Sequence, residues 1–433
     1  MRWWAAALIA LAGCGDDGGE VAPDGGGGGA DAALADGGAD AASARGPGDL
    51  LAVRYPAGPL HAPLSAEVVA RAAATRRGRA DVFAKVGASN TVSQGFFHCF
   101  SGSDIMWGAS AGLQPTRAFF ARTLDSFDRD SLAATVGWQA SDALAGSPNA
   151  IERELAAIQP GWAVVLFGTN DTFAAGVAPF ERGLTGVVDA LQAGGAVPIL
   201  TTIPPRGDSA SADALALEIN AIVRVVAARR GVPLLDLWQR LVGLPQYGLV
   251  ADGIHLASYQ GHPCWFTPAA LAAAGMNQRN IVTLEALDRV RRVVLEGAPA
   301  EAAAARLAGR GSWSEPYVID GLPFVDGGDT TLSSTREAAR YACGGQDEGG
   351  PEVVYRVELT TAATLRARVL VDDGVDVDLH WLDAPRADAC SARADRTLDV
   401  TAAAGVHYLA IDSFVSGGVA RAGGYRVTLV ALP

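Results

Sequence analysis

Apolar runs of strand length alternate with helical segments over residues 81–295, and this alternation constrains the fold more than any other feature of the chain. The strand-like runs lie at 81–86, 163–167, 197–201 and 232–237. Segments with helical character lie at 151–158, 180–193, 212–229 and 284–295. Continuous apolar runs indicate strands buried on both faces, as in parallel sheets covered by crossover helices. We therefore predict an α/β domain built around a parallel sheet.

The period of the apolar residues changes after a segment rich in Ala, Pro and Gly at 297–311. Short alternating runs follow at 352–358, 364–371, 375–381, 396–400, 407–411 and 425–430. Short alternating strands separated by turn residues are typical of a β-sandwich. We therefore place the α/β domain at 51–297, a linker at 298–312 and a small all-β sandwich at 313–433.

The first fifty residues differ in composition from the rest of the chain. Arg2 precedes an apolar run that is too short to span a bilayer and that ends in Leu11-Ala12-Gly13-Cys14. This run reads as a signal peptide, and its end resembles the lipobox of bacterial lipoproteins, in which the cysteine is lipidated; an ordinary secretory signal is the alternative. Residues 15–50 are mostly Gly, Ala and Asp, which cannot bury enough apolar surface to fold. We expect a signal at 1–14, a disordered tether at 15–50, and an exported chain anchored through Cys14 to the bacterial outer membrane or cell surface.

Three short segments carry residues suited to nucleophilic catalysis: Val86-Gly87-Ala88-Ser89-Asn90-Thr91, Gly168-Thr169-Asn170-Asp171 and Asp252-Gly253-Ile254-His255. Attack on an acyl ester needs a nucleophile, a base that accepts its proton, and donors for the oxyanion. Ser89 follows a predicted strand and is a candidate nucleophile. Three residues separate Asp252 from His255, which lets the carboxylate accept from the imidazole Nδ1 and leaves Nε2 free to act as the base. Taken alone, each motif has an ordinary structural explanation, such as a helix cap or a surface ion pair.

Together with Gly137, these segments resemble the conserved blocks of the SGNH (GDSL-like) hydrolases over residues 81–294. The resemblance implies a flavodoxin-like three-layer α/β/α fold and a serine esterase. It implies Ser89 as nucleophile, His255 and Asp252 as the rest of the triad, and an oxyanion hole formed by Ser89, Gly137 and Asn170. One residue departs from the family pattern, because Ala88 stands where the usual motif has Asp. The C-terminal part is similar to the pre-peptidase C-terminal type of bacterial β-sandwich.

Four cysteines remain once Cys14 is set aside, and an even number in an exported chain indicates two disulfides, with three connectivities open. In the fold that the resemblance implies, Cys99 and Cys264 both belong to loops at the catalytic face. We therefore expect the pairs Cys99–Cys264 and Cys343–Cys390. Free buried thiols are the alternative.

The net charge of −13 argues against nucleic acid or anionic lipid headgroups as partners, because both require a basic surface. We expect no cofactor and no metal site. His255 and His262 have no third ligand at zinc-site spacing. The acidic stretch 372–378 lacks the spacing of an EF-hand loop and fits a half-exposed strand better than a calcium site.

These features predict hydrolysis of an acyl ester, acetyl included, on a carbohydrate or lipid. The alternatives are a carbohydrate O-acyltransferase with the same triad, and a catalytically idle envelope binding module, which Ala88 would favour. Aromatic residues in segments expected at the rim of the crevice are Phe96, Phe97, Trp107, Trp138, Phe173, Tyr259 and Trp265. They fit core packing, an apolar acyl pocket or a platform for sugar stacking.

Overall fold

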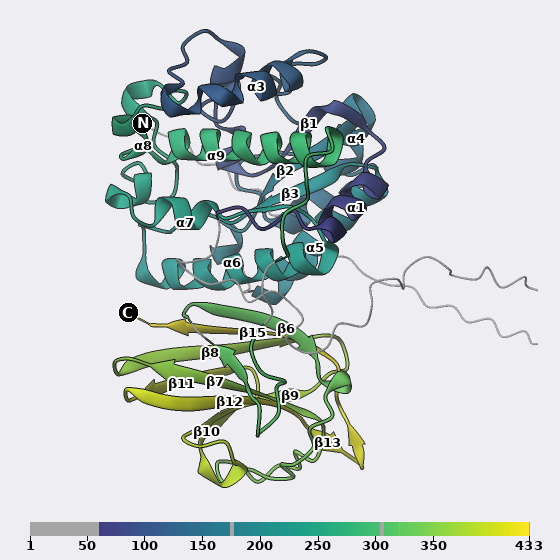
Figure 1. Ribbon diagram of the computed structural model, residues 1–433, viewed down its shortest axis with the longest axis vertical. Coiled ribbons are helices and arrows are strands. Elements are labelled where there is room, and N and C mark those ends of the chain that lie inside the picture. Colours follow the sequence, from purple (N-terminus) through teal and green to yellow (C-terminus); the bar gives the residue numbers. More distant parts are fainter. Residues whose placement is uncertain (1–59, 174–176, 304–306, 320, 433) are drawn as a thin grey trace, which may run out of the picture. The chain divides into compact units, whose positions relative to one another are not determined.

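The computed structural model describes residues 60–173, 177–303, 307–319 and 321–432 (Figure 1). Cys14, the signal segment 1–14 and the tether 15–50 lie outside these ranges, so the expectations for them stay predictions. No helix within the described ranges combines the length and the hydropathy that a membrane span requires. The domain limits at 51–297, 298–312 and 313–433 also stay predictions.

The α/β part is built on a parallel sheet in which the strands occur in the spatial order β1-β2-β3-β4. Its strands are β1 (Arg79–Gly87), β2 (Pro160–Leu166), β3 (Val197–Thr201) and β4 (Leu234–Leu235). β2 and β3 are buried along their whole length, as their continuous apolar sequences predict. On the free edge of β1, Gly87 forms a parallel bridge with Ala134. With residues 133–135 in the position of a second strand, the order is that of a flavodoxin-like sheet.

Two sets of helices cover the sheet. The helices of the domain are α1 (Ala66–Thr75), α2 (Ser89–Val92), α3 (Gln114–Ala121), α4 (Ala150–Ile158), α5 (Val177–Ala193), α6 (Ala210–Arg230), α7 (Leu237–Leu241), α8 (Pro268–Leu271) and α9 (Gly275–Val290). In the first set α4 packs on α5 and α5 on α6, whereas in the second α3 and α7 both pack on α9. Figure 1 shows α6 and α9 on either side of the strands. The predicted three-layer α/β/α class is therefore confirmed.

The helix predicted at 284–295 begins earlier, at Gly275, and its last turn, Arg291–Leu295, is a π-helix. The first turns were not predicted because residues 277–280 read Asn-Gln-Arg-Asn, which has no apolar face. In the structure all four of these polar residues are buried. They bind backbone groups of the loops at the catalytic face, as described below.

The C-terminal part consists of two main sheets that share one apolar core. Its strands are β5 (Tyr317–Ile319), β6 (Phe324–Asp329), β7 (Glu352–Leu359), β8 (Ala363–Val371), β9 (Val377–Leu382), β10 (Cys390–Ala394), β11 (Thr397–Ala402), β12 (Gly405–Ser413), β13 (Val415–Ser416), β14 (Val419–Ala420) and β15 (Gly424–Ala431). One sheet has the order β10-β9-β12-β7-β5 and the other β11-β8-β15-β6. Residues from both sheets, such as Tyr355, Leu379, Leu365 and Val427, meet in that core. The expected β-sandwich is confirmed.

Five strands of the sandwich were not predicted from the sequence: the two-residue strands β13 and β14, and three strands of the main sheets. β5 has three residues, β6 contains two consecutive glycines, and β10 reads Cys-Ser-Ala-Arg-Ala. None of them shows the regular alternation on which the sequence prediction depended. They form because neighbouring strands supply hydrogen-bond partners: β7 for β5, β15 for β6 and β9 for β10.

Candidate active site

A tight turn between β1 and α2 presents Ser89. β1 ends at Gly87, Ala88 is the N-cap residue of α2, and Ser89 is its first residue. A Cβ on Gly87 would lie 2.4 Å from Thr91 Oγ1 and 2.5 Å from the Leu166 carbonyl oxygen, so the helix can turn back this closely only over a glycine. Because Ser89 opens the helix, its backbone N–H has no intrahelical acceptor and stays available to an anion.

His255 and Asp252 lie within hydrogen-bonding distance of Ser89 and of each other. His255 Nε2 is 2.9 Å from Ser89 Oγ, and His255 Nδ1 is 2.7 Å from Asp252 Oδ2. The second carboxylate oxygen of Asp252 accepts the backbone N–H groups of Ile254, at 2.8 Å, and His255, at 2.9 Å. Slight desolvation opposes ionisation of Asp252, but the bonds from His255 and Ile254 outweigh it and lower its pKa to about 2. The carboxylate therefore stays charged and fixes the imidazole with Nε2 toward Ser89.

The loop that carries Gly137 is tied to the nucleophile turn through the backbone. The N–H of Gly87 donates to the Ala133 carbonyl at 3.1 Å, and the N–H of Thr135 donates to the Gly87 carbonyl at 3.2 Å. Gly137 follows in the left-handed region, with a φ of 85°, which favours glycine. The chain thus brings Gly137 to the same end of β1 as Ser89.

Asn170 follows β2 and is bonded to the Gly137 loop. Its side-chain amide donates one hydrogen to the Trp138 carbonyl at 2.8 Å. The bond to Trp138 does not use the second hydrogen of the amide. The neighbouring residue Asp171 is buried, and its Oδ2 has no hydrogen-bond partner. Burial raises the pKa of Asp171 to about 6, although a backbone hydrogen bond from Ala140 opposes the shift. Asp171 therefore links the Asn170 loop to the residues that follow Gly137.

Asn90 contributes to the site and was not predicted from the sequence. It is 2% exposed, and its side chain spans the two residues that flank His255. Its Oδ1 accepts the Leu256 N–H at 3.2 Å, and its Nδ2 donates to the Ile254 carbonyl at 3.5 Å. The residue after Ser89 thus holds the His255 loop in place. Its position beside Ser89 is the only signal in the sequence for this role.

The buried polar residues of α9 form hydrogen bonds with the segment that follows Ser89 and with the segment that follows His255. Arg279 Nη1 donates to the Asn90 carbonyl at 2.5 Å and Nη2 to Thr91 Oγ1 at 3.0 Å. Asn280 accepts from the Phe97 N–H at 3.0 Å and donates to the Gly95 and Pro263 carbonyls at 2.8 and 3.1 Å. These bonds explain why a run of polar residues is buried at the start of α9.

A disulfide joins the nucleophile segment to the histidine segment. The structure pairs Cys99 with Cys264, at a Cα–Cα distance of 5.8 Å, and Cys343 with Cys390, at 5.3 Å. These are the pairs expected from the sequence. Closing the 165-residue span between Cys99 and Cys264 stabilises the fold by about 4 to 5 kcal/mol on the chain-entropy model.

The aromatic residues near the site divide into packing and surface groups. Phe96 and Phe97 are fully buried, and Trp107 and Trp138 pack against the core, so these four are mainly structural. The side chain of Phe173 lies outside the described part of the structure. Trp265 is half-buried and stacks on His262, with ring centroids 3.8 Å apart and planes 5° apart.

Asp104 fixes this stacked pair. Its carboxylate is 2.6 Å from His262 Nδ1 and accepts the Trp265 indole N–H at 2.7 Å. Asn277 of α9 donates to the backbone carbonyls of both ring residues, at 2.8 and 2.9 Å. The pair is therefore a rigid aromatic surface next to the Cys99–Cys264 disulfide.

Residues 100–262 match the family model described as GDSL-like Lipase/Acylhydrolase family. The chain contains a GDSL-like hydrolase domain. The matched range includes Gly137, Asn170, Asp252 and His255, but it begins after Ser89. This part of the chain is thus similar to SGNH/GDSL-type hydrolases, the class that cleaves carboxylic esters, and the role of Ser89 depends on the geometry described above.

Solved structures match each of the two parts of the chain. A GDSL-like lipase from Bacteroides thetaiotaomicron is 14% identical, with 51% of this chain and 96% of that chain covered and a TM-score of 0.33. An acetyl xylan esterase from Geobacillus stearothermophilus is 16% identical, with 48% and 95% covered and a TM-score of 0.34. The pre-peptidase C-terminal domain of a Bacillus anthracis collagenase is 16% identical, with 26% and 91% covered and a TM-score of 0.18. No curated protein matches the chain.

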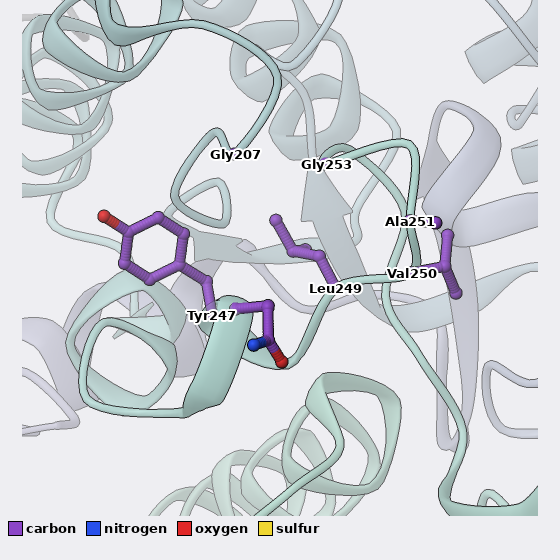
Figure 2. Close-up of a pocket in the computed structure, with 7 residues that line it drawn as sticks. Gly207, Tyr247, Leu249, Val250, Ala251 and Gly253 are labelled. Carbon is purple, nitrogen blue, oxygen red and sulfur yellow. The ribbon is translucent and has the colours of Figure 1, made fainter.

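A cavity of about 460 Å³ adjoins the Asp252 turn of the GDSL-like hydrolase domain. It is lined by Gly207, Gln246, Tyr247, Leu249, Val250, Ala251 and Gly253. Figure 2 shows Tyr247 on one side and Val250 on the other, with Leu249 between them. Ser89 and His255 are not lining residues. The cavity therefore adjoins the turn that carries Asp252 without being lined by the candidate nucleophile or base.

Proposed function

We propose that the protein is a serine esterase that removes a short acyl group, with acetyl as the first candidate, from a carbohydrate ester. The observation that carries the proposal is the continuous hydrogen-bonded sequence from Asp252 through His255 to Ser89, with contacts of 2.7 and 2.9 Å. In a serine hydrolase these contacts belong to the acid, base and nucleophile.

In the proposed reaction, Ser89 Oγ attacks the ester carbonyl carbon while His255 Nε2 accepts the hydroxyl proton. The ionised Asp252 stabilises the imidazolium that forms. The resulting oxyanion accepts hydrogen bonds from the N–H groups of Ser89 and Gly137 and from the Asn170 amide. His255 then donates its proton to the departing alkoxide, which leaves the acyl group on Ser89. A water molecule then attacks the acyl carbonyl carbon while His255 accepts its proton. His255 returns that proton to Ser89 Oγ as the carboxylic acid leaves.

The exposure of the triad supports a substrate whose alcohol part is large. The side chains of His255 and Asp252 are 44% and 46% exposed, so a bulky group on the leaving oxygen can extend into solvent. This open site also gives water access to the acyl-enzyme. This access of water favours hydrolysis over transfer to a sugar acceptor.

The Trp265–His262 pair supports a carbohydrate as the alcohol part. The Asp104 carboxylate is bonded to ring nitrogens at the edges of both rings. The outer faces of the stacked pair can therefore pack against an apolar surface, such as the C–H face of a sugar ring. Because the rings are already held in place, little conformational entropy is lost when a ligand binds.

Acyl-enzyme kinetics test the catalytic proposal. With p-nitrophenyl acetate we expect a burst of p-nitrophenol equal to one molecule per protein. Mass spectrometry should locate the acetyl group that is left behind on Ser89. Added sugar acceptors should not change the rate of turnover, whereas acceleration by an acceptor would indicate the acyltransferase. If no burst and no turnover occur in the folded protein, the idle binding module, which Ala88 favours, replaces the esterase.

Trp265→Ala tests the carbohydrate part separately. We expect KM for acetylated oligosaccharides to rise about tenfold, with kcat on p-nitrophenyl acetate unchanged. Trp265→Phe is the matched control and should retain most of the binding. Equal losses on both substrates would show that the residue is needed only for structure.

We also propose that a lipid on Cys14 holds the protein at the surface of the bacterial envelope. The lipobox-like segment and the Gly, Ala and Asp tether of residues 15–50 support this location. Cys14→Ser should move the protein out of the membrane fraction. Wild-type recovery of this variant with the membranes would contradict the proposal.

A further inference from the structure

Three potential metal ligands converge inside the β-sandwich, far along the chain from the triad. Asp378 and His380 belong to β9, and Glu348 precedes β7. Their donor atoms all lie within 4.8 Å of one another. The residues are 2%, 0% and 1% exposed, respectively. Such complete burial of two carboxyl groups and an imidazole requires compensating partners.

The His380 ring is held in one orientation. It stacks on Tyr341, with centroids 3.7 Å apart and planes 11° apart. Its Nδ1 faces the Cys343–Cys390 disulfide, 3.7 and 4.0 Å from the two sulfur atoms. The opposite nitrogen, Nε2, therefore points at Glu348, whose Oε1 is 3.8 Å away. This distance is too long for a hydrogen bond.

The atoms that face one another in this cluster lack partners. His380 Nε2 and both carboxylate oxygens of Glu348 are buried without a hydrogen bond. His380 Nε2 and Glu348 Oε1 thus face each other across 3.8 Å with no hydrogen bond between them. A cation between them would give both groups a partner.

Arg393 supplies only part of the positive charge. Its Nη2 donates to Asp378 Oδ2 at 2.7 Å, and its Nε is 3.6 Å from Glu348 Oε1, beyond hydrogen-bonding distance. One guanidinium thus faces two buried carboxylates.

We propose that Glu348, Asp378 and His380 bind a divalent transition-metal ion of the Zn²⁺ class. Tetrahedral Zn²⁺ has Zn–N and Zn–O bonds of about 2.0 to 2.2 Å, which places its donors about 3.3 to 3.5 Å apart. The 3.8 Å between His380 Nε2 and Glu348 Oε1 needs only a small closure to reach this value. An imidazole donor favours zinc over calcium, which takes six to eight oxygen ligands.

The remaining contacts suit this site. Arg393 Nη2 donates to Asp378 Oδ2 and so orients the carboxylate beside the other two ligands. The bound ion would join the segment before β7 to β9, on the same side as the Cys343–Cys390 disulfide. Its expected role is to stabilise the β-sandwich, and it takes no part in ester hydrolysis.

Metal binding to the full chain tests the proposal. The protein is prepared without reductant, because thiols released from Cys343 and Cys390 would themselves bind zinc, and is stripped with a chelator. Titration with Zn²⁺ should show one site with a Kd below 1 µM and raise the Tm by several degrees, whereas Ca²⁺ should do neither. Glu348→Gln and His380→Gln should abolish both effects.

His407→Gln is the matched control, because His407 lies in the same sandwich and both of its ring nitrogens already have partners, Asp383 and the Ala403 carbonyl. It should bind Zn²⁺ like the wild type. Absence of a site tighter than about 10 µM, or full binding in His380→Gln, would overturn the proposal. Should the cluster variants not fold, anomalous diffraction at the zinc edge from wild-type crystals decides: a peak between Glu348, Asp378 and His380 supports the site, and its absence refutes it.

Discussion

Replacing Asn90 with Ala should separate the positioning of His255 from the chemistry of the triad. The Asn90 side chain accepts the Leu256 N–H at 3.2 Å and donates to the Ile254 carbonyl at 3.5 Å, so it holds the chain on both sides of His255. Leu256 is 6% exposed, so its N–H would remain buried without an acceptor. A buried unpaired donor costs about 1 to 3 kcal/mol, and the longer bond adds little.

The effect on catalysis follows from the freedom that His255 gains. A displacement of about 1 Å costs as much as 10²-fold in rate, so we expect kcat to fall about 10- to 100-fold. KM should change little, because Asn90 is buried and does not touch the substrate. The assay is turnover of p-nitrophenyl acetate, with the free energy of unfolding measured by urea denaturation for the same samples.

Asn280→Ala is the matched control for this experiment. Asn280 is also buried and bonds the nucleophile segment to the histidine side, through Phe97, Gly95 and Pro263, but it does not flank His255. We expect it to lose at least as much stability as Asn90→Ala while keeping more of its kcat. If kcat falls equally in both variants, general loosening explains the loss, and the positioning role of Asn90 is wrong.

Three further predictions concern the site. Ser89→Ala and His255→Ala should each lower kcat by several orders of magnitude, and the double variant should be no worse than either. Asp252→Asn should lower kcat about 10⁴-fold with the circular dichroism spectrum unchanged. Additive losses in the double variant would argue against a shared mechanism. Ala88→Asp supplies the missing N-cap acceptor of α2, so the free energy of unfolding in urea should rise by about 0.5 to 2 kcal/mol. The esterase activity should be equal or higher. A lower free energy of unfolding would show that the carboxylate is not accommodated. Burial raises the pKa of Asp171 to about 6, so the folded state holds this proton more tightly than the unfolded state and the wild type loses stability as pH rises from about 4 to 6. The Tm of Asp171→Asn relative to wild type should therefore increase over that range and level off above it, and a pH-independent difference would contradict the shift.

The sequence predicted the elements whose apolar pattern is regular. The strand at 197–201 was predicted with the bounds that the structure gives, and β7, β8 and α4 differ from their predictions by one residue. The prediction at 232–237 was longer than β4, Leu234–Leu235, because Val232 and Pro233 precede the strand and Leu237 begins α7. The start of α9 was missed for the opposite reason, since its buried residues are polar.

The sequence by itself determined the fold class and the candidate residues of the triad, because apolar periodicity and short motifs are local properties of the chain. Only the tertiary structure decided which distant groups meet. Asn90 and Leu256 are 166 positions apart, and their bond exists because the β1 turn and the His255 loop lie at the same end of one sheet. Glu348 and His380 likewise meet only because the strands they adjoin belong to one sheet, β7 and β9 on either side of β12. A hydrogen bond or a ligand cluster depends on distance in space, which a single sequence does not contain.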